Sequence, residues 1–313
     1  MRKISIDKLN SLFSAIAENE TLYLPVDTKA GAKFEKWHDG AVLSDALNTV
    51  RSAKDFFFPQ TENLMDFKVD GKNIEIIDTR EECEDFVIFG VRACDVKSFE
   101  ILDRVFLAEP VDSYYKNRRE HGVIMSLACT KPHETCFCGT FGIDASSPEG
   151  DIVCHITGDA LCMDAKTEKG KALLSRLDSL TEETDGKAVE EQKKVTKERL
   201  AKLPLASLSA DSFGAGKTEK FFGAPEWKEL SQACLGCGTC TFVCPTCQCY
   251  DIKDFNTGHG VKRFRCWDSC MYSDFTKMSA GQPRLTQLER FRQRFMHKLV
   301  YYQFPLYLLP QGS

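Results

Sequence analysis

The sequence has no hydrophobic run long enough to cross a membrane, no low-complexity segment and no internal repeat. Its longest apolar stretch near the end, LVYYQFPLYLLP, spans twelve residues, whereas a membrane-spanning helix needs about 20. The first twenty residues carry acidic side chains at Asp7, Glu18 and Glu20, which interrupt any apolar region of a signal peptide. We therefore expect a cytoplasmic protein without a membrane span.

Basic charge and paired histidines are also lacking. Lysine and arginine number 41 against 46 acidic residues, and the net charge of −5 gives no reason to expect nucleic acid or an anionic membrane as a partner. The six histidines are scattered, and none forms a pair typical of catalysis or of a zinc protease. A length of 313 residues with 42% hydrophobic residues is typical of a globular protein with one large or two smaller domains.

Cysteine, in contrast, is abundant, with fifteen residues. Thiols in the cytosol stay reduced, so this number favours metal chemistry over disulfides. An odd count also leaves one cysteine over in any full pairing scheme. The cysteines are therefore the first place to look for function.

The first half of the sequence alternates strand and helix signals. Continuous apolar runs at Thr21–Val26, Asp85–Val91 and Gly122–Ala128 predict buried strands. A helix that Asp95 could cap lies between the last two, which predicts a parallel strand–helix–strand unit in an α/β domain. The segment DFKVDGKNIEIID, with its turn at Asp70 and Gly71, predicts a hairpin.

Four cysteines in the second half share the spacing C-x2-C-x2-C-x3-C and precede a proline: Cys234, Cys237, Cys240 and Cys244. This run holds cubane iron–sulfur clusters in bacterial ferredoxins. Gly236 and Gly238 permit the tight turns that wrap such a cluster. A zinc site more often has two separated C-x2-C pairs. The spacing therefore favours an iron–sulfur cluster over zinc.

A second, more dispersed set lies in the first half: Cys94, Cys129, Cys136 and Cys138. Cys94 and Cys129 each follow a predicted strand, so parallel pairing would bring them to one edge of the sheet, where open α/β sheets bind ligands. The alternatives are that both are small buried hydrophobic residues, or that His133 joins them in a zinc site. Cys83, Cys154 and Cys162 lie in or beside apolar runs, and we expect them in the core.

Five stretches together resemble one family: FGVRACDVKSFEILDRVF, CTKPHETCFCGTFG, CLGCGTCTFVCPTCQCYD, WDSCM and RFRQRFMHKLVYY. They are similar to the dicluster iron–sulfur electron-transfer subunit of anaerobic sulfite reductase (its A subunit) and of cytosolic sulfhydrogenases (their beta subunit). Related subunits accompany heterodisulfide-reductase-type complexes. The resemblance covers about Asp85 to Tyr302.

The resemblance implies [4Fe–4S] clusters on both cysteine sets. One cluster would lie in the C-terminal domain, and the other would be an N-terminal cluster on Cys94, Cys129, Cys136 and Cys138. It also implies two partners, an FAD- and NAD(P)-binding oxidoreductase subunit and a catalytic reductase or hydrogenase subunit.

The sequence departs from the family in one respect, because a second C-x2-C-x2-C-x3-C-P run normally follows the HK pair. This sequence shows no such run before Ser313. In two-cluster ferredoxins the fourth cysteine of each run ligates the other cluster. Either the cluster is incompletely loaded, or one of five cysteines closes it locally: Cys244, Cys247, Cys249, Cys266 or Cys270.

The predicted organisation has three parts, an α/β domain at residues 1–166, a helical connector with a loop at 167–226, and a small α-rich ferredoxin-like iron–sulfur domain at 227–313. The predicted function is electron relay without catalytic residues of its own. The alternatives are a zinc-stabilised assembly scaffold and a catalytic iron–sulfur reductase subunit. A basic run from Arg290 to Lys298 precedes aromatic residues at Tyr301, Tyr302, Phe304 and Tyr307, and suits either a partner interface or packing on its own domain.

Overall fold

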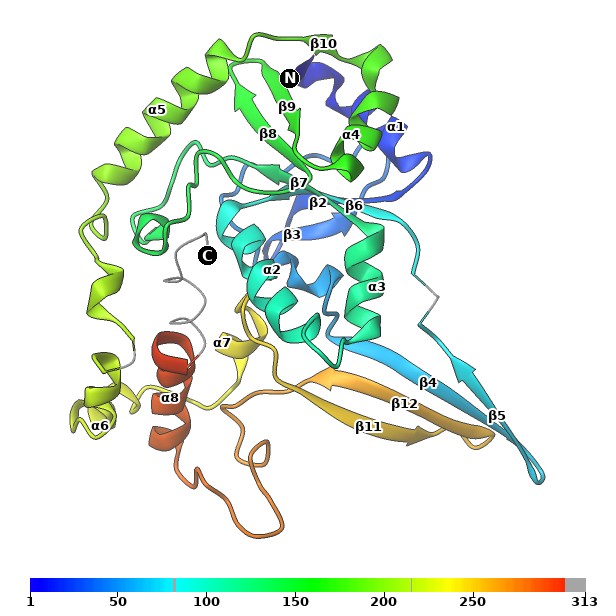
Figure 1. Ribbon diagram of the computed structural model, residues 1–313, viewed down its shortest axis with the longest axis vertical. Helices are drawn as coiled ribbons and strands as arrows, with labels where there is room; N and C mark the ends of the chain where they lie inside the picture. The colour runs from blue at the N-terminus through cyan, green and yellow to red at the C-terminus, as the bar shows by residue number, and fades with distance from the viewer. Residues whose placement is uncertain (81–82, 215, 302–313) are drawn as a thin grey trace. The chain divides into compact units, whose positions relative to one another are not determined.

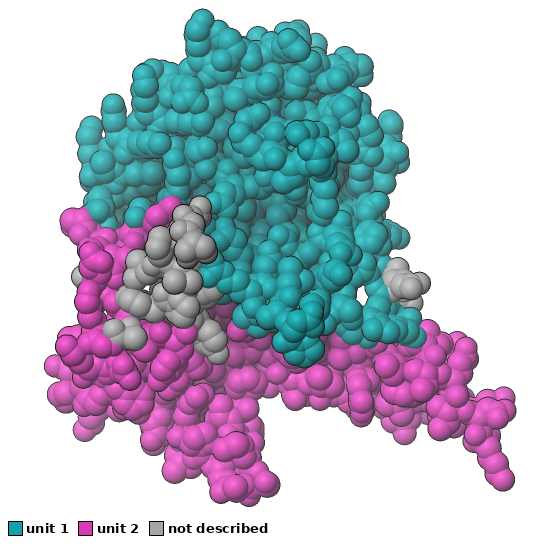
Figure 2. Space-filling model, in the orientation of Figure 1, with its two compact units in different colours: residues 1–59, 78–139, 143–206 teal, residues 60–77, 140–142, 207–313 magenta. Residues whose placement is uncertain are grey.

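The computed structural model describes residues 1–80, 83–214 and 216–301. The chain divides into two compact units (Figure 2). Unit 1 comprises residues 1–59, 78–139 and 143–206, and unit 2 comprises residues 60–77, 140–142 and 207–313. Tyr302, Phe304 and Tyr307 of the predicted interface lie outside the described residues. No helix in the described ranges is long and apolar enough to cross a membrane.

Unit 1 is built on an eight-stranded sheet with the strand order β10-β1-β9-β8-β7-β6-β2-β3 (Figure 1). The four strands from β8 to β2 are parallel, and the flanking pairs are antiparallel. The strands are β1 (Arg2–Ser5), β2 (Thr21–Thr28), β3 (Gly31–Lys36), β6 (Phe86–Val91), β7 (Gly122–Leu127), β8 (Ile152–Thr157), β9 (Ala160–Ala165) and β10 (Glu182–Glu183). The sheet is therefore partly parallel, as predicted.

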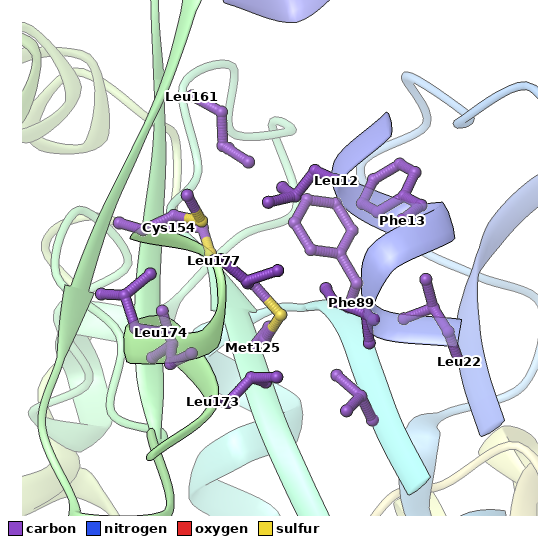
Figure 3. Close-up of a cluster of buried hydrophobic side chains, with 14 of the residues drawn as sticks. Leu12, Phe13, Leu22, Phe89, Met125, Cys154, Leu161, Leu173, Leu174 and Leu177 are labelled. Carbon is purple, nitrogen blue, oxygen red and sulfur yellow. The ribbon is translucent and has the colours of Figure 1, made fainter. Parts of the chain in front are cut away.

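Helices cover both faces of this sheet. They are α1 (Leu9–Ala17), α2 (Ala93–Phe106), α3 (Ser113–His121), α4 (Glu168–Arg176) and α5 (Lys187–Ala201). On one face, side chains of α1 and α4 such as Leu12 and Leu174 pack with Phe89 and Met125 of the strands (Figure 3). On the other face, Phe57 stacks edge-on against Phe99 of α2 and contacts Phe86 of β6.

Burial on both faces explains the continuous apolar run of β6, in which every residue is buried. The predicted strands at β2, β6 and β7, and the parallel pairing of β6 with β7, are confirmed. The predicted helix is also present, but Arg92 is its N-cap residue and Asp95 lies within its first turn. The helix therefore begins at Ala93, two residues before Asp95.

Unit 2 contains a four-stranded sheet with the order β11-β12-β4-β5. Its strands are β4 (Thr61–Asp70), β5 (Asn73–Asp78), β11 (Tyr250–Asn256) and β12 (Gly260–Trp267), and its helices are α6 (Glu226–Leu230), α7 (Thr239–Phe242) and α8 (Gln287–Met296), followed by a π-helical turn at His297–Tyr301. The predicted hairpin is confirmed as β4 and β5, and β4 pairs antiparallel with β12. The ferredoxin-like character of this unit stays a prediction.

A buried ion pair links the two segments of this sheet, which are far apart in the sequence. Arg265 of β12 donates from Nε to Glu62 of β4 at 2.6 Å, and both side chains are almost fully buried. Breaking such a pair by removing one partner would leave an uncompensated buried charge. The pair therefore makes the register of β4 against β12 specific.

A substitution at Gly170 tests the packing of α4 on the sheet. A Cβ atom at this position would lie 2.1 Å from the Asp151 carbonyl oxygen, which already accepts a hydrogen bond from the Lys166 amide. Alanine is the better helix former by about 1 kcal/mol, yet we expect Gly170→Ala to lower the free energy of unfolding by about 1–3 kcal/mol, because overpacking outweighs propensity. Chemical denaturation measures this change.

Gly223→Ala is the matched control, because a Cβ atom there meets nothing within 4 Å. It should change the free energy of unfolding by less than about 0.5 kcal/mol. A Gly170→Ala protein as stable as the parent would contradict the packing described for α4.

Candidate metal centres

The four N-terminal candidate cysteines come together in unit 1. Cys94 is the second residue of α2, directly after β6, and Cys129 lies two residues beyond β7. Cys138 begins a 3-10 turn at Cys138–Phe141. Cys94 interacts electrostatically with Cys129 and Cys138, and Cys136 does so with Cys129 and Cys138. The predicted meeting of Cys94 and Cys129 at the carboxyl ends of parallel strands is therefore present.

Without a metal, the thiols of Cys94, Cys129 and Cys138 are held in their neutral form. Burial is the main cause and raises the pKa values of Cys94 and Cys129, and it raises that of Cys138 to about 11. Neighbouring thiols raise the pKa values of all three further, as does Asp95 for Cys94 and Cys129. A bound metal or cluster reverses this preference, because thiolates are its ligands and protons leave when it binds.

Arg92 and α5 hold the loop that carries Cys129, and sequence reasoning assigned a role to neither. The Arg92 guanidinium donates to the carbonyl of Ala128 at 3.2 Å and to that of Leu47 at 3.0 Å. Thr196, which is buried on α5, donates from its hydroxyl to the Cys129 carbonyl at 3.0 Å. The backbone around Cys129 is thus fixed from two sides. Helix α5 is charged and mostly exposed, but the side that carries Thr196 packs on the loop.

His133 has other partners. Its Nδ1 lies 2.9 Å from the Thr135 hydroxyl, and its backbone amide donates to Cys136 Sγ at 3.3 Å. Backbone N–H groups that donate to ligand sulfur are a recurrent feature of iron–sulfur sites. His133 therefore contacts Cys136 through its backbone, with its amide donating to the sulfur and its carbonyl accepting from the Cys136 amide at 2.9 Å.

In unit 2, the loop from Cys234 to Cys240 wraps tightly at two glycines. Gly236 and Gly238 have φ angles of +68° and +74°, in the left-handed region that glycine adopts readily. A Cβ atom on Gly238 would also lie 2.7 Å from the Tyr272 ring, whose hydroxyl donates to the Cys237 carbonyl at 3.2 Å. Both glycines are thus required by backbone conformation, and Gly238 also by its close approach to Tyr272.

Two thiols of this loop have defined polar partners. Gln287 of α8 donates from Nε2 to Cys234 Sγ at 3.2 Å. Cys237 is exposed, with its Sγ 3.3 Å from the Thr239 hydroxyl, and hydrogen bonds from the Thr239 side chain and backbone lower the pKa of Cys237. The loop therefore presents polarised thiols at the surface.

The fourth member of the run, Cys244, lies with another set of thiols. The side chain of Cys244 is hydrogen-bonded to that of Cys247, and the side chain of Cys249 to that of Cys270. Cys247 and Cys249 also interact electrostatically, so the two pairs are neighbours. Cys247 and Cys270 are buried. We call Cys244, Cys247, Cys249 and Cys270 the inner thiol group.

Each pair of the inner thiol group contains one thiol with a lowered pKa and one with a raised pKa. The hydrogen bond from Cys247 brings the pKa of Cys244 well below its usual value. The hydrogen bond from Cys249, assisted by His297, lowers the pKa of Cys270 to about 4. The same hydrogen bonds, with burial, raise the pKa values of Cys247 and Cys249. Each hydrogen bond thus shifts the pKa values of its two thiols in opposite directions.

Helix α8 and the turn after it supply cations to the inner thiol group. Arg294 donates to Cys247 Sγ at 3.4 Å and to the Cys240 carbonyl at 2.6 Å. Lys298 donates to the Thr246 hydroxyl at 2.6 Å. Burial alone would lower the pKa of Lys298, but the neighbouring Cys244 and Cys247 raise it. The basic run from Arg290 to Lys298 was predicted either to form a partner interface or to pack on its own domain. Arg294 and Lys298 pack on their own domain.

The donor sets fit a cluster better than a single ion. Among residues 1–80, 83–214 and 216–301, no three His, Cys, Asp or Glu side chains converge closely enough to hold one metal ion. A zinc ion needs ligand atoms within about 2.0–2.3 Å, whereas an iron–sulfur cluster spreads four thiolates over several metal atoms. Thiols that are neighbours without meeting at one point, with amide, amine and guanidinium donors around them, suit a cluster.

Comparison with known proteins agrees with this chemistry. Residues 233–306 match the family model of a 4Fe-4S dicluster domain, which defines the chain as an iron–sulfur protein. The chain is 31% identical over 306 residues to the sulfhydrogenase 2 subunit beta of Pyrococcus furiosus, with 95% of this chain and 87% of that protein covered. The chain therefore belongs to the sulfhydrogenase beta-subunit family. No solved structure matches it.

The remaining cysteines divide between the core and less buried positions. Cys154 and Cys162 are buried in unit 1, as predicted. Cys83 is only half-buried, with its Sγ near the Glu84 carbonyl, so its placement in the core was wrong. Cys266, one of five candidates to close the cluster, lies on β12 opposite Asp251 and takes no part in the pairs of the inner thiol group. The pairing of β11 with β12 fixes the position of Cys266.

The contacts of Arg294 predict a role in stability. We expect Arg294→Met to lower the free energy of unfolding of the cluster-free protein by about 1.5–3 kcal/mol, because it removes hydrogen bonds from a charged donor. Arg263→Met is the matched control, because Arg263 pairs with Asp254 on an exposed strand at 2.7 Å, and exposed pairs contribute little to stability. Equal effects of the two substitutions in urea denaturation would contradict a special role for Arg294.

Proposed function

We propose that this chain is the electron-transfer subunit of an oxidoreductase complex. It would pass electrons between an FAD- and NAD(P)-binding subunit and a catalytic subunit of the hydrogenase, sulfite reductase or heterodisulfide reductase type. The observation that carries the proposal is the Cys234–Cys240 loop, because it lies in the matched dicluster domain and places Cys237 at the surface. Leu235 beside it is 92% exposed, which suits a partner that docks over the loop.

In this proposal [4Fe–4S] clusters, when bound, supply one-electron carriers. Cys234, Cys237 and Cys240 would hold one cluster in unit 2, and Cys94, Cys129, Cys136 and Cys138 would hold one in unit 1. Gln287 donates to Cys234 Sγ, and hydrogen bonding with Thr239 lowers the pKa of Cys237, so both contacts favour the more negative, reduced state. No general acid, base or nucleophile is required, because electrons alone are transferred.

The cluster on the Cys234–Cys240 loop provides the main test. In the complex purified without oxygen with its native partners, we expect Cys237→Ser to reduce iron content and to remove a reduced-state EPR signal. Electron flow between NAD(P)H and the catalytic subunit should stop, because the exposed loop is the proposed contact. Cys83→Ser is the control, since Cys83 belongs to neither thiol set. Unchanged iron and EPR spectra in Cys237→Ser would contradict the proposal.

The N-terminal cluster has its own test, with a matched pair of buried cysteines in unit 1. Cys129→Ala should lose iron and also lower the melting temperature, because a site gathered from separate loops forms only with the fold. Cys154→Ala should lower the melting temperature through its cavity but retain all iron. Full iron content in Cys129→Ala would show that Cys129 is ordinary core, and zinc in place of iron would support the scaffold alternative.

A further inference from the structure

The inner thiol group has the composition of a complete ligand set. It contains four cysteines, the number that binds a two-iron or a four-iron cluster. Its members come from two segments, Cys244–Cys249 and the loop after β12 that carries Cys270. Asp268 donates its amide to the Cys249 carbonyl at 3.0 Å, which ties the second segment to the first. Local folding of unit 2 thus brings four thiols together.

A cavity adjoins these thiols. It has a volume of about 410 Å³, and three of the four thiol residues line it, namely Cys247, Cys249 and Cys270. The other walls include the cationic side chains Arg284, Arg294 and Lys298, with His297 beside them. A cluster with four thiolates is net negative, so cations around it compensate its charge and raise its reduction potential. The cavity therefore has both the sulfur ligands and the charge that such a cluster needs.

We propose that the inner thiol group binds an iron–sulfur cluster of its own, separate from the one on the Cys234–Cys240 loop. This assignment rests on the proposed function and deepens it by naming a further carrier site in unit 2. Cys244 belongs to the inner site, in line with two-cluster ferredoxins, where the fourth cysteine of a run serves the other cluster. The cluster on the Cys234–Cys240 loop then takes its fourth ligand from outside this run.

Binding releases the protons that the inner thiols still carry, because the ligands are thiolates. Arg294 is placed to respond to both sites, because its guanidinium contacts Cys247 Sγ and the Cys240 carbonyl. The cations of α8 thus favour the ligated form of the inner group.

Substitution in the full chain purified without oxygen tests the assignment. Cys249→Ser and Cys270→Ser should each lower iron and acid-labile sulfide by one cluster per chain, and Mössbauer spectra distinguish a two-iron from a four-iron loss. The EPR signal that depends on Cys237 should persist in both variants. Cys266→Ser, a half-buried neighbour on β12, should keep the parental iron and sulfide.

Alkylation of the unsubstituted protein gives a second readout that does not depend on how the variants fold. Iodoacetamide followed by mass spectrometry should label Cys244 at least tenfold faster after iron is removed with a chelator, whereas the rate at Cys83 should not change. Parental iron in Cys249→Ser and Cys270→Ser, or equal labelling with and without iron, would overturn the inner site while Cys237-dependent iron persists. A chain without any iron would instead overturn the proposed function.

Discussion

Charge compensation between cysteine sulfur and the cations of α8 and the turn after it is the interaction on which unit 2 depends. Arg294 and Lys298 follow the cysteine run in the sequence. Their side chains are partly buried, and they donate to Cys247 Sγ and to the Thr246 hydroxyl. A capping box at Thr286 and Glu289 fixes where α8 begins and therefore which residues reach the thiols. Without these cations, the negative charge of thiolates that ligate a cluster would be left uncompensated. The helix and the cysteine loops consequently stabilise each other.

In unit 1, the sheet brings the candidate thiols together. Parallel strands β6 and β7 end at one edge, and this edge places Cys94 and Cys129 together although 35 residues separate them in the sequence. Arg92 and Thr196 then fix the backbone that carries Cys129 through its carbonyl and that of Ala128. The thiols themselves remain free to ligate. A preorganised set of this kind lowers the conformational cost of binding a cluster.

Local pattern predicted much of this arrangement. Continuous apolar runs identified β2, β6 and β7, and the spacing of Cys234, Cys237 and Cys240 identified their loop, because both signals are contained in short segments. The pairing of β4 with β12 had no such signal, since it joins segments about 190 residues apart through the buried pair Glu62 and Arg265. Long-range pairing of this kind depends on tertiary contacts that neither segment encodes alone.

The contacts within the inner thiol group could not be predicted from local sequence either. Sequence analysis named Cys244, Cys247, Cys249, Cys266 and Cys270 as candidates to close the cluster, because spacing alone does not say which thiols meet. The fold separates them, since Cys270 pairs with Cys249 while Cys266 faces Asp251 across the sheet. The contacts of Arg294 were also beyond prediction, because an arginine on an amphipathic helix is most often solvated.

The central claim is that these thiols hold iron–sulfur clusters and carry electrons. Visible absorption of the chain purified without oxygen tests it most directly. We expect a brown protein whose broad absorption decreases when dithionite is added and returns on mild reoxidation, because reduction of the clusters weakens their sulfur-to-iron transitions. A colourless protein that contains zinc and does not respond to dithionite would contradict the account and favour an assembly scaffold.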